Sequence, residues 1–495
     1  MLFHVCECLR FMNLIHFLSL IYRQQMTDRS QEHILVNART QRIIPYIPPA
    51  KGREPSELRN APSLDPASHW VDCMAKIYNV GKLWRIHGDL YDLTPYYDLH
   101  PGGRVFLERT RGSDCTEAFE CHHVQKIPQV LLDRYRVSKK EQVESQEVPR
   151  FSYDESFAKI KAFVADYMKN QKKNPSGATP IWAGMLYLGV VIQFLLVAHL
   201  AAKRKSHLLA ILGGLLLTGC WGVGHNQMHR GRKGFWAFLR YAIDLTGFSS
   251  YDQTVTHALS HHQNANTYHD MEASDFDIGG VYWLTNERKN SWLPYRLFPL
   301  TFLLFAASVS PTIVLMRLAN RIKSGDILRA DVLIPLGLIA HMSRTSGSLK
   351  KGIMLSLTMW SAFSAWFVPS SFSLHHSFNK ETGAPYCYRE GESGFERDFA
   401  KHQIISTLDH SMNMNNYLAI VLFAHLNIHT IHHIFPTIDR VHHKELWDLL
   451  YSQNIGGFRD INDRKGRIHD FWTEIYPGIF RMVYERRFIP IVVNQ

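Results

Sequence analysis

Two long apolar segments in the middle of the chain limit its possible folds more than any other feature. They are IWAGMLYLGVVIQFLLVAHLAA (181–202) and LLAILGGLLLTGCWGV (208–223), and only a short basic loop separates them. About 20 apolar residues cross a bilayer as one helix, so two such segments in succession predict a helical hairpin in a membrane. A hairpin buried in a soluble core is the alternative, but the near absence of charge along both segments favours the membrane.

Two more apolar segments follow, at about Leu297–Met316 and Ile353–Leu374. Between them lies VLIPLGLIAHM (332–342), which is too short to cross a bilayer and predicts an interfacial or partial span. We therefore expect an all-α membrane region with about four transmembrane helices. Basic residues flank the spans on both sides, so their distribution does not orient the region.

The chain has 28 histidines, and some of them form three clusters near these segments. Spacings of three or four residues within a cluster place side chains on one face of a helix. Neutral imidazole is a good ligand for iron, zinc and copper, and this number of imidazoles is too large for one ion and sufficient for two. The candidate metal ligands are His225 and His229, then His257, His261 and His262, and finally His429, His432 and His433.

The order of spans and clusters indicates whether the clusters can meet. The first cluster directly follows the second span, no convincing span separates it from the second cluster, and the third cluster follows the fourth span. An even number of crossings therefore separates the clusters, which places all three on one face of the membrane. A full crossing by residues 332–342 would strand the third cluster on the other face.

Charge and cysteine content narrow the range of partners. The formal net charge is +11, which suits an anionic membrane surface or an acidic ligand. Nucleic acid is not an expected partner, because the basic residues are spread along the chain and form no known nucleic-acid motif. The seven cysteines include no CxxC pair, which predicts a reducing compartment.

Polar stretches divide the chain into five expected parts. These are a mostly disordered N-terminal extension at 1–70, a small soluble domain at 71–140, a linker at 141–180, the membrane region at 181–450 and a cytosolic C-terminal tail at 451–495. We expect the linker to act as a flexible tether, with a helix allowed between Phe151 and Met168.

The motif HPGG at 100–103 is the strongest signal in the soluble domain. A Pro-Gly-Gly turn directly after a histidine holds that side chain in a tight corner of exposed backbone. With LWRIHGDLYDLT (83–94) before it and GSDCTEAFECHH (112–123) after it, the motif resembles the haem-binding domain of cytochrome b5. The resemblance implies an α+β fold and a haem b with His100 and His123 as axial ligands, His122 being the alternative to His123.

A haem with histidine on both sides has no open position for O2, so we expect the domain to transfer electrons. Acidic residues flank the haem site and could dock a basic reductase, by resemblance an NADH-cytochrome b5 reductase. The alternative is a solvated acidic face without a partner. These acidic residues are Asp98, Asp114, Glu117 and Glu120.

The membrane region resembles the fatty acid desaturases of the front-end type, which carry an N-terminal b5 domain. AHLNIHTIHHIFPTIDR (424–440) carries most of the resemblance. Front-end enzymes usually begin this third box with Gln, where the chain has His429. The chain also has Asn226 where an acidic residue is common, and three residues instead of two between the first two histidines of the second box. The order of parts is most similar to that of the insect cytochrome b5-related proteins.

The resemblance implies two non-haem iron ions bound by the three clusters on the cytosolic face. It also implies a further histidine ligand from the end of the fourth span, where the sequence reads SLHHS. The candidates are His376, which we prefer, and His375, His402 and His425. After the second cluster, His269 and Asp270 are expected to orient ligands through hydrogen bonds.

The expected protein is thus an α+β cytochrome b5-like haem domain followed by an all-α polytopic membrane desaturase domain. By resemblance it is an oxidoreductase of the endoplasmic reticulum membrane that desaturates a fatty acyl chain, carried as acyl-CoA or phospholipid, with O2 and electrons from the haem. The alternatives are a lipid hydroxylase, a sphingoid-base desaturase, and a haem protein that only carries electrons and uses its membrane region as an anchor. The intact clusters count against the last alternative.

Overall fold

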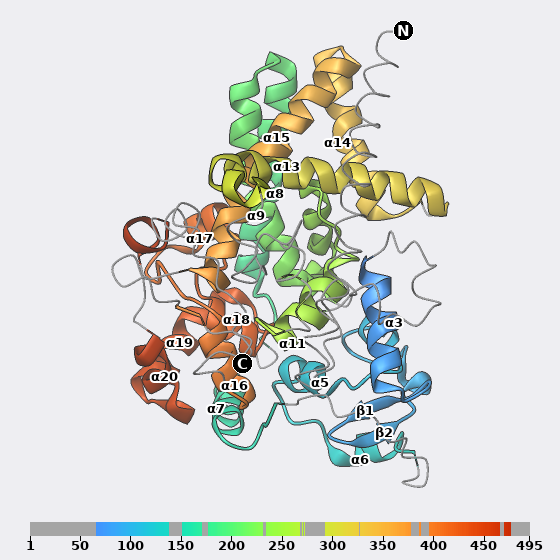
Figure 1. The fold of residues 1–495 in the computed structure, drawn as a ribbon, viewed down its shortest axis with the longest axis vertical. Coiled ribbons are helices and arrows are strands. Elements are labelled where there is room, and N and C mark those ends of the chain that lie inside the picture. The colour runs from blue at the N-terminus through green and yellow to red at the C-terminus, as the bar shows by residue number, and fades with distance from the viewer. Residues whose placement is uncertain are drawn as a thin grey trace.

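A computed structural model gives the fold of the chain (Figure 1). It describes residues 66–137, 151–170, 177–230, 234–267, 270, 272, 293–325, 327–377, 386–387, 396–465 and 470–476. Residues 1–65 of the expected N-terminal extension lie outside this set. The described part is helical apart from one two-stranded sheet. In Figure 1 the long helices occupy the upper part of the molecule, and the N-terminal domain lies at the lower right.

Four helices are long and apolar enough to cross a membrane, and each contains one of the predicted spans. They are α8 (Ile181–Arg204), α9 (His207–Met228), the Leu303–Ile322 part of α13 (Leu293–Ser324) and nearly all of α15 (Leu349–His376). The predicted number of spans is therefore confirmed. The predicted partial span lies in α14 (Ala330–Ser346), whose 17 residues are fewer than the about 20 that a bilayer requires.

The hairpin of α8 and α9 forms the centre of the membrane region. The chain reverses at Lys205, which has a left-handed conformation with φ 52°, and Ser206 caps α9 by accepting a hydrogen bond from the Leu209 backbone. One face of α8 is buried against α9. Leu196, at 60% exposure, lies on the other face, as expected for a helix in contact with lipid.

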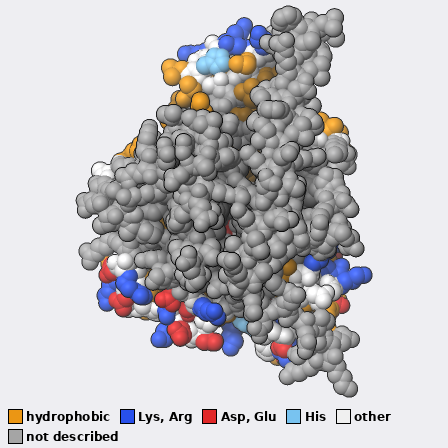
Figure 2. Space-filling view, in the orientation of Figure 1, with side chains coloured by type: hydrophobic (Ala, Val, Ile, Leu, Met, Phe, Trp, Pro, Cys, Tyr) orange, Lys and Arg blue, Asp and Glu red, His pale blue; other side chains and the backbone are white. Residues whose placement is uncertain are grey.

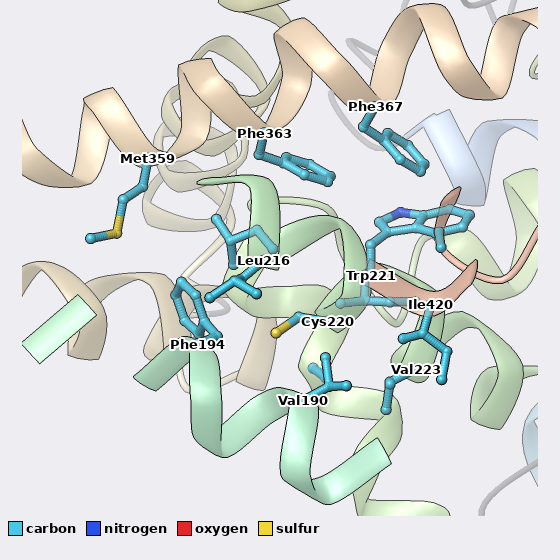
Figure 3. Packing of buried hydrophobic residues seen from close by; sticks show 14 of the residues in the cluster. Val190, Phe194, Leu216, Cys220, Trp221, Val223, Met359, Phe363, Phe367 and Ile420 are labelled. Carbon is cyan, nitrogen blue, oxygen red and sulfur yellow. The ribbon is translucent and has the colours of Figure 1, made fainter. Parts of the chain in front are cut away.

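Helix α9 is the most enclosed of the four: 67% of the residues in its apolar 18-residue stretch are buried, against 17–56% in the other three helices. Figure 3 shows why: α8 and α15 pack on it from two sides, and Ile420 of α17 (Asn416–Phe423) reaches it from a third. In the same view Trp221 of α9 lies beside Phe367 of α15, with ring centroids 4.5 Å apart. This packing fixes the end of α9, which carries the first histidine cluster.

A close backbone approach also positions this end of α9. The loop before α18 (His429–Ile434) passes directly over Gly222, and a Cβ atom at Gly222 would overlap the carbonyl of Ala424. Only glycine leaves room for this contact, which brings the first and third clusters together.

The N-terminal domain is a small α+β unit. Its elements are α3 (Pro66–Tyr78), β1 (Trp84–Ile86), β2 (Asp89–Tyr91), η1 (Thr94–Tyr96), α4 (Arg104–Thr110), α5 (Thr116–His122) and α6 (Gln129–Asp133). The two strands are antiparallel, with Trp84 opposite Tyr91. Trp84, Tyr91 and Tyr97 form the buried core of this unit.

The segment expected to be a flexible linker contains a packed helix, α7 (Ser156–Asn170), which overlaps the stretch where the sequence allows one and ends two residues beyond it. Its apolar face, which includes Phe157 and Val164, is buried against Phe399 and Phe435. The chain before α7 is also attached, because Ser152 exchanges backbone hydrogen bonds with residues 397 and 399. A helix with one apolar face gains more by packing on this core than by remaining in solvent.

The C-terminal part surrounds the third cluster. It comprises α16 (Phe399–Ser406), α17, α18, α19 (His443–Ser452) and α20 (Phe458–Lys465). Residues of the expected tail belong to this core as well, since Phe458 and Phe471 are fully buried. In Figure 2, charged side chains of both signs gather at the lower end of the described surface, whereas hydrophobic side chains are visible towards the upper end beside Lys and Arg.

Candidate metal centre and haem site

The three histidine clusters meet at one end of the long helices, as the number of crossings predicts. Nine buried imidazoles form two sets, within each of which one nitrogen per ring lies within 4.8 Å of the others. The first histidine group is His225, His229, His257, His262 and His432. The second histidine group is His261, His375, His429 and His433.

Local helix geometry explains how neighbouring histidines are divided between the groups. His225 and His229 lie four residues apart at the end of α9, on one face. The second cluster lies on η4 (Thr256–His261), a π-helical turn followed by α11 (His262–Asn264). Because a π-turn brings residues i and i+5 together, His257 and His262 share the first group, while His261 points to the second.

In the first group, the ring nitrogens are close enough to bind one metal ion together. His225 Nε2 lies 2.6 Å from His257 Nε2 and 2.9 Å from His229 Nε2. His262 Nε2 lies 2.8 Å from His257 Nε2. His432 enters from α18, with its ring centroid 4.3 Å from that of His262.

The second group has the same character. His375 Nε2 lies 3.1 Å from His261 Nε2 and 2.9 Å from His429 Nε2. His433 Nε2 lies 3.1 Å from His429 Nε2. The two groups adjoin, because the rings of His262 and His433 stack with centroids 4.2 Å apart.

The hydrogen bonds made by the Nδ1 atoms indicate the role of the Nε2 atoms on the same rings. The Nδ1 atoms of His261, His375 and His433 face acceptors: the Asp270 carboxylate at 3.0 Å, the Ser406 carbonyl at 2.7 Å and the Gln403 side-chain oxygen at 3.0 Å. A neutral imidazole has one N–H, so these contacts place it on Nδ1 and leave a lone pair on Nε2. Lone pairs that converge at about 3 Å repel each other unless a cation lies between them, and such N-ligand sets suit iron or zinc.

The environment keeps most of these rings in the neutral form that binds metal. Burial, and after it neighbouring imidazoles, hold the pKa values of His229, His262 and His433 well below the ordinary histidine value. His261 is different: burial lowers its pKa, but the Asp270 and Glu272 carboxylates outweigh this and raise it. A carboxylate at Nδ1 also increases the basicity of Nε2 as a ligand.

Several polar groups outside the clusters support this arrangement. Glu272 lies 2.8 Å from His257 Nδ1. Asp409 caps α18 by accepting hydrogen bonds from the His429 and Thr430 backbone. The buried guanidinium of Arg440 also approaches the first group, at 2.7 Å from His225 Nδ1 and 3.2 Å from His432 Nε2. It can only donate there, so this contact does not place the N–H of His225 on Nδ1.

The sequence analysis found the eight cluster histidines and Asp270, and the structure brings all nine residues together. It places His375, one of the alternatives for the further ligand, in the second group. The side chain of the preferred His376 and the whole of His269 lie outside the described residues. Neither group includes His402, which hydrogen-bonds the Ala265 carbonyl at 2.8 Å, or His425.

Residues that the sequence analysis missed are those without a local pattern. Gln403 and Asp409 lie 20 or more residues before the histidines of the third cluster that they contact. Arg440 ends the stretch 424–440 and contacts His225 and His432. Glu272 follows the second cluster in HDMEASDFD, where the acidic character of the stretch was the available signal. Asn226, which stands where an acidic residue is common in front-end enzymes, donates a hydrogen bond to Asp439 at 2.9 Å.

The N-terminal domain holds a second pair of histidines. The rings of His100 and His123 lie next to each other, with centroids 6.0 Å apart and ring planes at 77°. The Nδ1 atom of each donates to a backbone carbonyl, Gly103 at 2.9 Å and Phe119 at 2.8 Å. A Cβ atom at Gly102 would lie 2.9 Å from the His100 ring, so the HPGG turn leaves room for the imidazole. This pair is suited to bind a haem iron from both sides.

His122 does not join this pair. Its ring contacts Phe106, with centroids 5.2 Å apart, and approaches His229 of the first group at 6.3 Å. The arrangement supports His123 over His122 as the partner of His100.

The acidic residues expected to dock a reductase are mostly engaged within the chain. Asp114 is buried and accepts from Thr116 at 2.6 Å. Glu117 accepts from the Tyr153 hydroxyl at 2.9 Å, and Glu120 pairs with Lys161 of α7 at 2.5 Å. Of the four, Asp98 is the one that is exposed. Glu117 and Glu120 therefore attach the N-terminal domain to the segment that contains α7, whereas Asp114 bonds within the domain.

Further contacts join the N-terminal domain to the membrane region. In one apolar cluster, Trp70 and Met74 of α3 pack with Val255 and Leu259 beside the second histidine cluster. Arg109 lies over the ring of Tyr251, 4.2 Å from its centroid. The two parts of the described chain therefore form one packed unit.

Comparison with known proteins agrees with this geometry. Residues 204–455 match the family described as fatty acid desaturase, and residues 64–140 match the cytochrome b5-like haem/steroid binding domain. The cytochrome b5-related protein of Drosophila melanogaster is 30% identical over 380 residues, covering 75% of this chain and 82% of that protein. The probable Delta(5) fatty acid desaturase C of Dictyostelium discoideum is 24% identical over 398 residues, covering 74% and 84%.

A third relative, the acyl-lipid (8-3)-desaturase of Mortierella alpina, is 23% identical over 401 residues, covering 74% of this chain and 86% of that protein. No solved structure matches the chain. The fold and the site define a membrane protein with clustered histidines suited to bind metal and a fused cytochrome b5-like domain. The chain belongs to the fatty acid desaturase family and carries an N-terminal cytochrome b5-like domain.

Proposed function

We propose that the protein uses O2 to introduce a double bond into a fatty acyl chain, with electrons supplied through the fused haem domain. The observation that carries the proposal is the convergence of nine buried imidazoles into two adjoining groups at one end of four apolar helices. An electron carrier with a membrane anchor would need the pair formed by His100 and His123, but not two buried sets of ligand nitrogens.

The proposed reaction balances as follows. A –CH2–CH2– unit loses two hydrogens and becomes –CH=CH–, two electrons and two protons come from outside, and O2 leaves as two water molecules. Two iron ions bound in the histidine groups would supply the O2-dependent oxidation, and a haem between His100 and His123 would supply one-electron transfer.

The chain's own residues hold and orient these groups. Asp270, Glu272 and Gln403 fix ring orientations through the Nδ1 atoms of three ligands. Burial of all nine rings excludes water from the centre. The apolar faces of the four long helices would admit the acyl chain from the bilayer, and the substrate would be an acyl-CoA or a phospholipid.

By the same proposal the haem domain and both histidine groups face the cytosol, in the membrane of the endoplasmic reticulum, and an NADH-cytochrome b5 reductase supplies electrons. The carboxylates of Asp114, Glu117 and Glu120 are used inside the chain. A reductase would therefore contact other parts of the haem domain, such as the exposed face near Asp98.

A lipid profile of yeast that expresses the full chain tests the activity. We expect new unsaturated acyl chains that disappear in the His432→Ala/His433→Ala variant. The exposed Asp448→Asn, which lies outside both histidine groups, is the control, and we expect it to retain product. A product that persists in the double variant would contradict the proposal, and a hydroxylated product would replace desaturase with hydroxylase.

The metal content of the purified protein is the second test. We expect one haem and two non-haem iron ions per chain, with non-haem iron lost in the His432→Ala/His433→Ala variant and haem retained. We expect His100→Ala and His123→Ala to lose haem, whereas His122→Ala retains it. A wild-type chain with haem and no non-haem metal would favour the electron carrier.

A further inference from the structure

His122 occupies a place between the two sites that neither site explains. It is the last residue of α5, next to His123, but successive side chains on a helix point in directions about 100° apart. His123 therefore faces His100, with ring centroids 6.0 Å apart, while His122 faces His229 of the first histidine group at 6.3 Å.

The ring of His122 is enclosed and held in this orientation. Its Nδ1 atom lies 3.0 Å from the Ala118 carbonyl, and Phe106 packs against its face. Its Nε2 atom is buried and has no hydrogen-bond partner among the described residues. The Thr437 hydroxyl, three residues beyond α18, donates to the His122 carbonyl at 3.4 Å and links this point to the third cluster.

A short path through packed atoms follows from this placement. It runs from His123 across one peptide bond to His122, over a ring-to-ring approach to His229, and then 2.9 Å to His225 Nε2 within the first group. The described ring contacts of His122 and His123 reach the first group and not the second.

Electron tunnelling weakens steeply with distance and is better through bonded and closely packed atoms than across a gap. We propose that His122 is the bridge between the haem domain and the metal centre, and that electrons enter the centre at the first histidine group. This inference rests on the proposed function. In each transfer a haem held by His100 and His123 would give up one electron and metal ions held by the histidine groups would accept it, while His122 would be neither oxidised nor reduced. We regard His122 as a positioning residue, because it acts through His123 and His229.

Flash photoreduction of the full-length, haem- and iron-loaded protein tests the bridge without measuring product. Under anaerobic conditions a photo-activated ruthenium complex reduces the ferric haem by one electron, and the reoxidation of the haem is followed optically. We expect His122→Ala to slow this reoxidation roughly tenfold or more, because truncation leaves a gap where packed atoms stood. Haem content, haem spectrum, haem potential and non-haem iron should stay at wild-type values.

Two further variants separate the bridge from a general loosening of the structure. His122→Phe restores a packed ring and should recover most of the lost rate. His443→Ala removes a buried ring that lies 6.1 Å from His432, with no described contact to the haem domain, and should reoxidise haem within about twofold of wild type.

The outcomes are distinct. A His122→Ala protein that reoxidises haem at the wild-type rate would overturn the bridge, as would an equal slowing in His443→Ala. A His122→Phe protein as slow as His122→Ala would overturn the ring path. If wild-type reoxidation is no faster than in the His432→Ala/His433→Ala variant, the metal centre is not the acceptor, and the proposed function fails together with the inference.

Discussion

The histidine ligands depend on hydrogen bonds at the nitrogen that faces away from the centre, and Asp270 gives the clearest case. Its carboxylate is fully buried and lies 3.0 Å from His261 Nδ1. We expect Asp270→Asn to weaken non-haem iron binding about 10- to 100-fold, as for other carboxylates that orient a metal-bound histidine. Iron per chain after dialysis against a chelator measures the effect. The exposed Asp448→Asn is the control, and equal iron loss in both would contradict the assignment.

Acid should destabilise the folded protein through its buried histidines, and His402 is suited to show it because it belongs to neither group. Burial lowers its pKa to about 4, whereas an unfolded histidine titrates near 6.5. Below pH 6.5 the unfolded chain binds a proton that the folded chain does not, so stability falls between pH 6.5 and 4, by about 1.4 kcal/mol per pH unit for one site. The melting temperature of His402→Gln should depend less steeply on pH over this range.

His87 provides a control of opposite sign. Its hydrogen bond to Glu120 raises its pKa above the ordinary value. Protonated His87 therefore adds stability below pH 6.5 that is lost as pH rises through the raised pKa. We expect His87→Gln to lose stability at acid pH relative to wild type. Identical pH profiles for His402→Gln and wild type would contradict the linkage.

At the residue scale, the sequence predicted which histidines lie together on one helix turn. Spacing of three or four residues was enough for His225 and His229, because that spacing alone defines a helix face. For the further ligand the sequence analysis preferred His376, whereas the structure places His375 in the second group. Both lie on α15, and the residue that faces the centre depends on how that helix is rotated by its neighbours. Gln403 reaches the centre through tertiary packing, which no local pattern encodes.

At the scale of single elements, the second cluster shows a limit of α-helical reasoning. An α-helix would place His257 and His261 on one face, but the π-turn of η4 pairs His257 with His262. Short π-helical turns have no simple sequence signature and are frequent at functional sites. The long spans were predicted well, because twenty apolar residues in a row allow few other structures.

The close approach at Gly222 leads to a prediction for α9. Gly222→Ala would force the helix away from the loop at Ala424, and overpacking of this kind costs about 1–3 kcal/mol. We expect a lower melting temperature and reduced non-haem iron, because the shift separates the first and third clusters.

Gly189→Ala in α8 is the matched control for that substitution. A Cβ atom at Gly189 would meet nothing within 4 Å, and alanine favours helix over glycine by about 1 kcal/mol. This variant should be neutral or slightly stabilising. If Gly222→Ala behaves like Gly189→Ala, the close approach does not constrain α9.

At the scale of the whole molecule, the haem domain is packed rather than tethered. The composition of residues 141–180 suggested a flexible linker, because the segment is polar at both ends. The apolar face of α7 lies between these polar stretches and contributes little to the average composition. The role of that face is recognised only in the folded structure, where it packs on a core. Phe399, Phe435 and other residues more than 200 positions away form this core. Docking of this kind depends on two surfaces, and the sequence of one does not reveal the other.

The ion pair between Lys161 and Glu120 tests the docking. Both side chains are mostly buried, and Lys161 Nζ lies 2.5 Å from Glu120 Oε2. We expect Lys161→Glu to weaken docking by about 1.5–3 kcal/mol, the usual contribution of a hydrogen bond to a charged group. Faster hydrogen exchange in α5 and α7 would report the loss.

Two variants control this measurement. Lys161→Glu/Glu120→Lys restores opposite charges and should recover part of the protection. Lys444→Glu breaks an exposed pair with Asp448 and should leave exchange in α5 unchanged, since such pairs contribute only about 0.3–0.5 kcal/mol. Unchanged exchange in α5 of Lys161→Glu would show that this ion pair does not hold the domain.

The packed haem domain has a consequence for how electrons reach the metal centre in the cell. Under the proposed function, every metal centre has its own donor in a fixed ratio of one to one, because the haem domain rests on the membrane region of the same chain. Free cytochrome b5 would then have to displace a resident competitor to reach the centre. The rate of lipid modification would rise and fall with the abundance of reductase, and would be insensitive to the pool of soluble electron carriers.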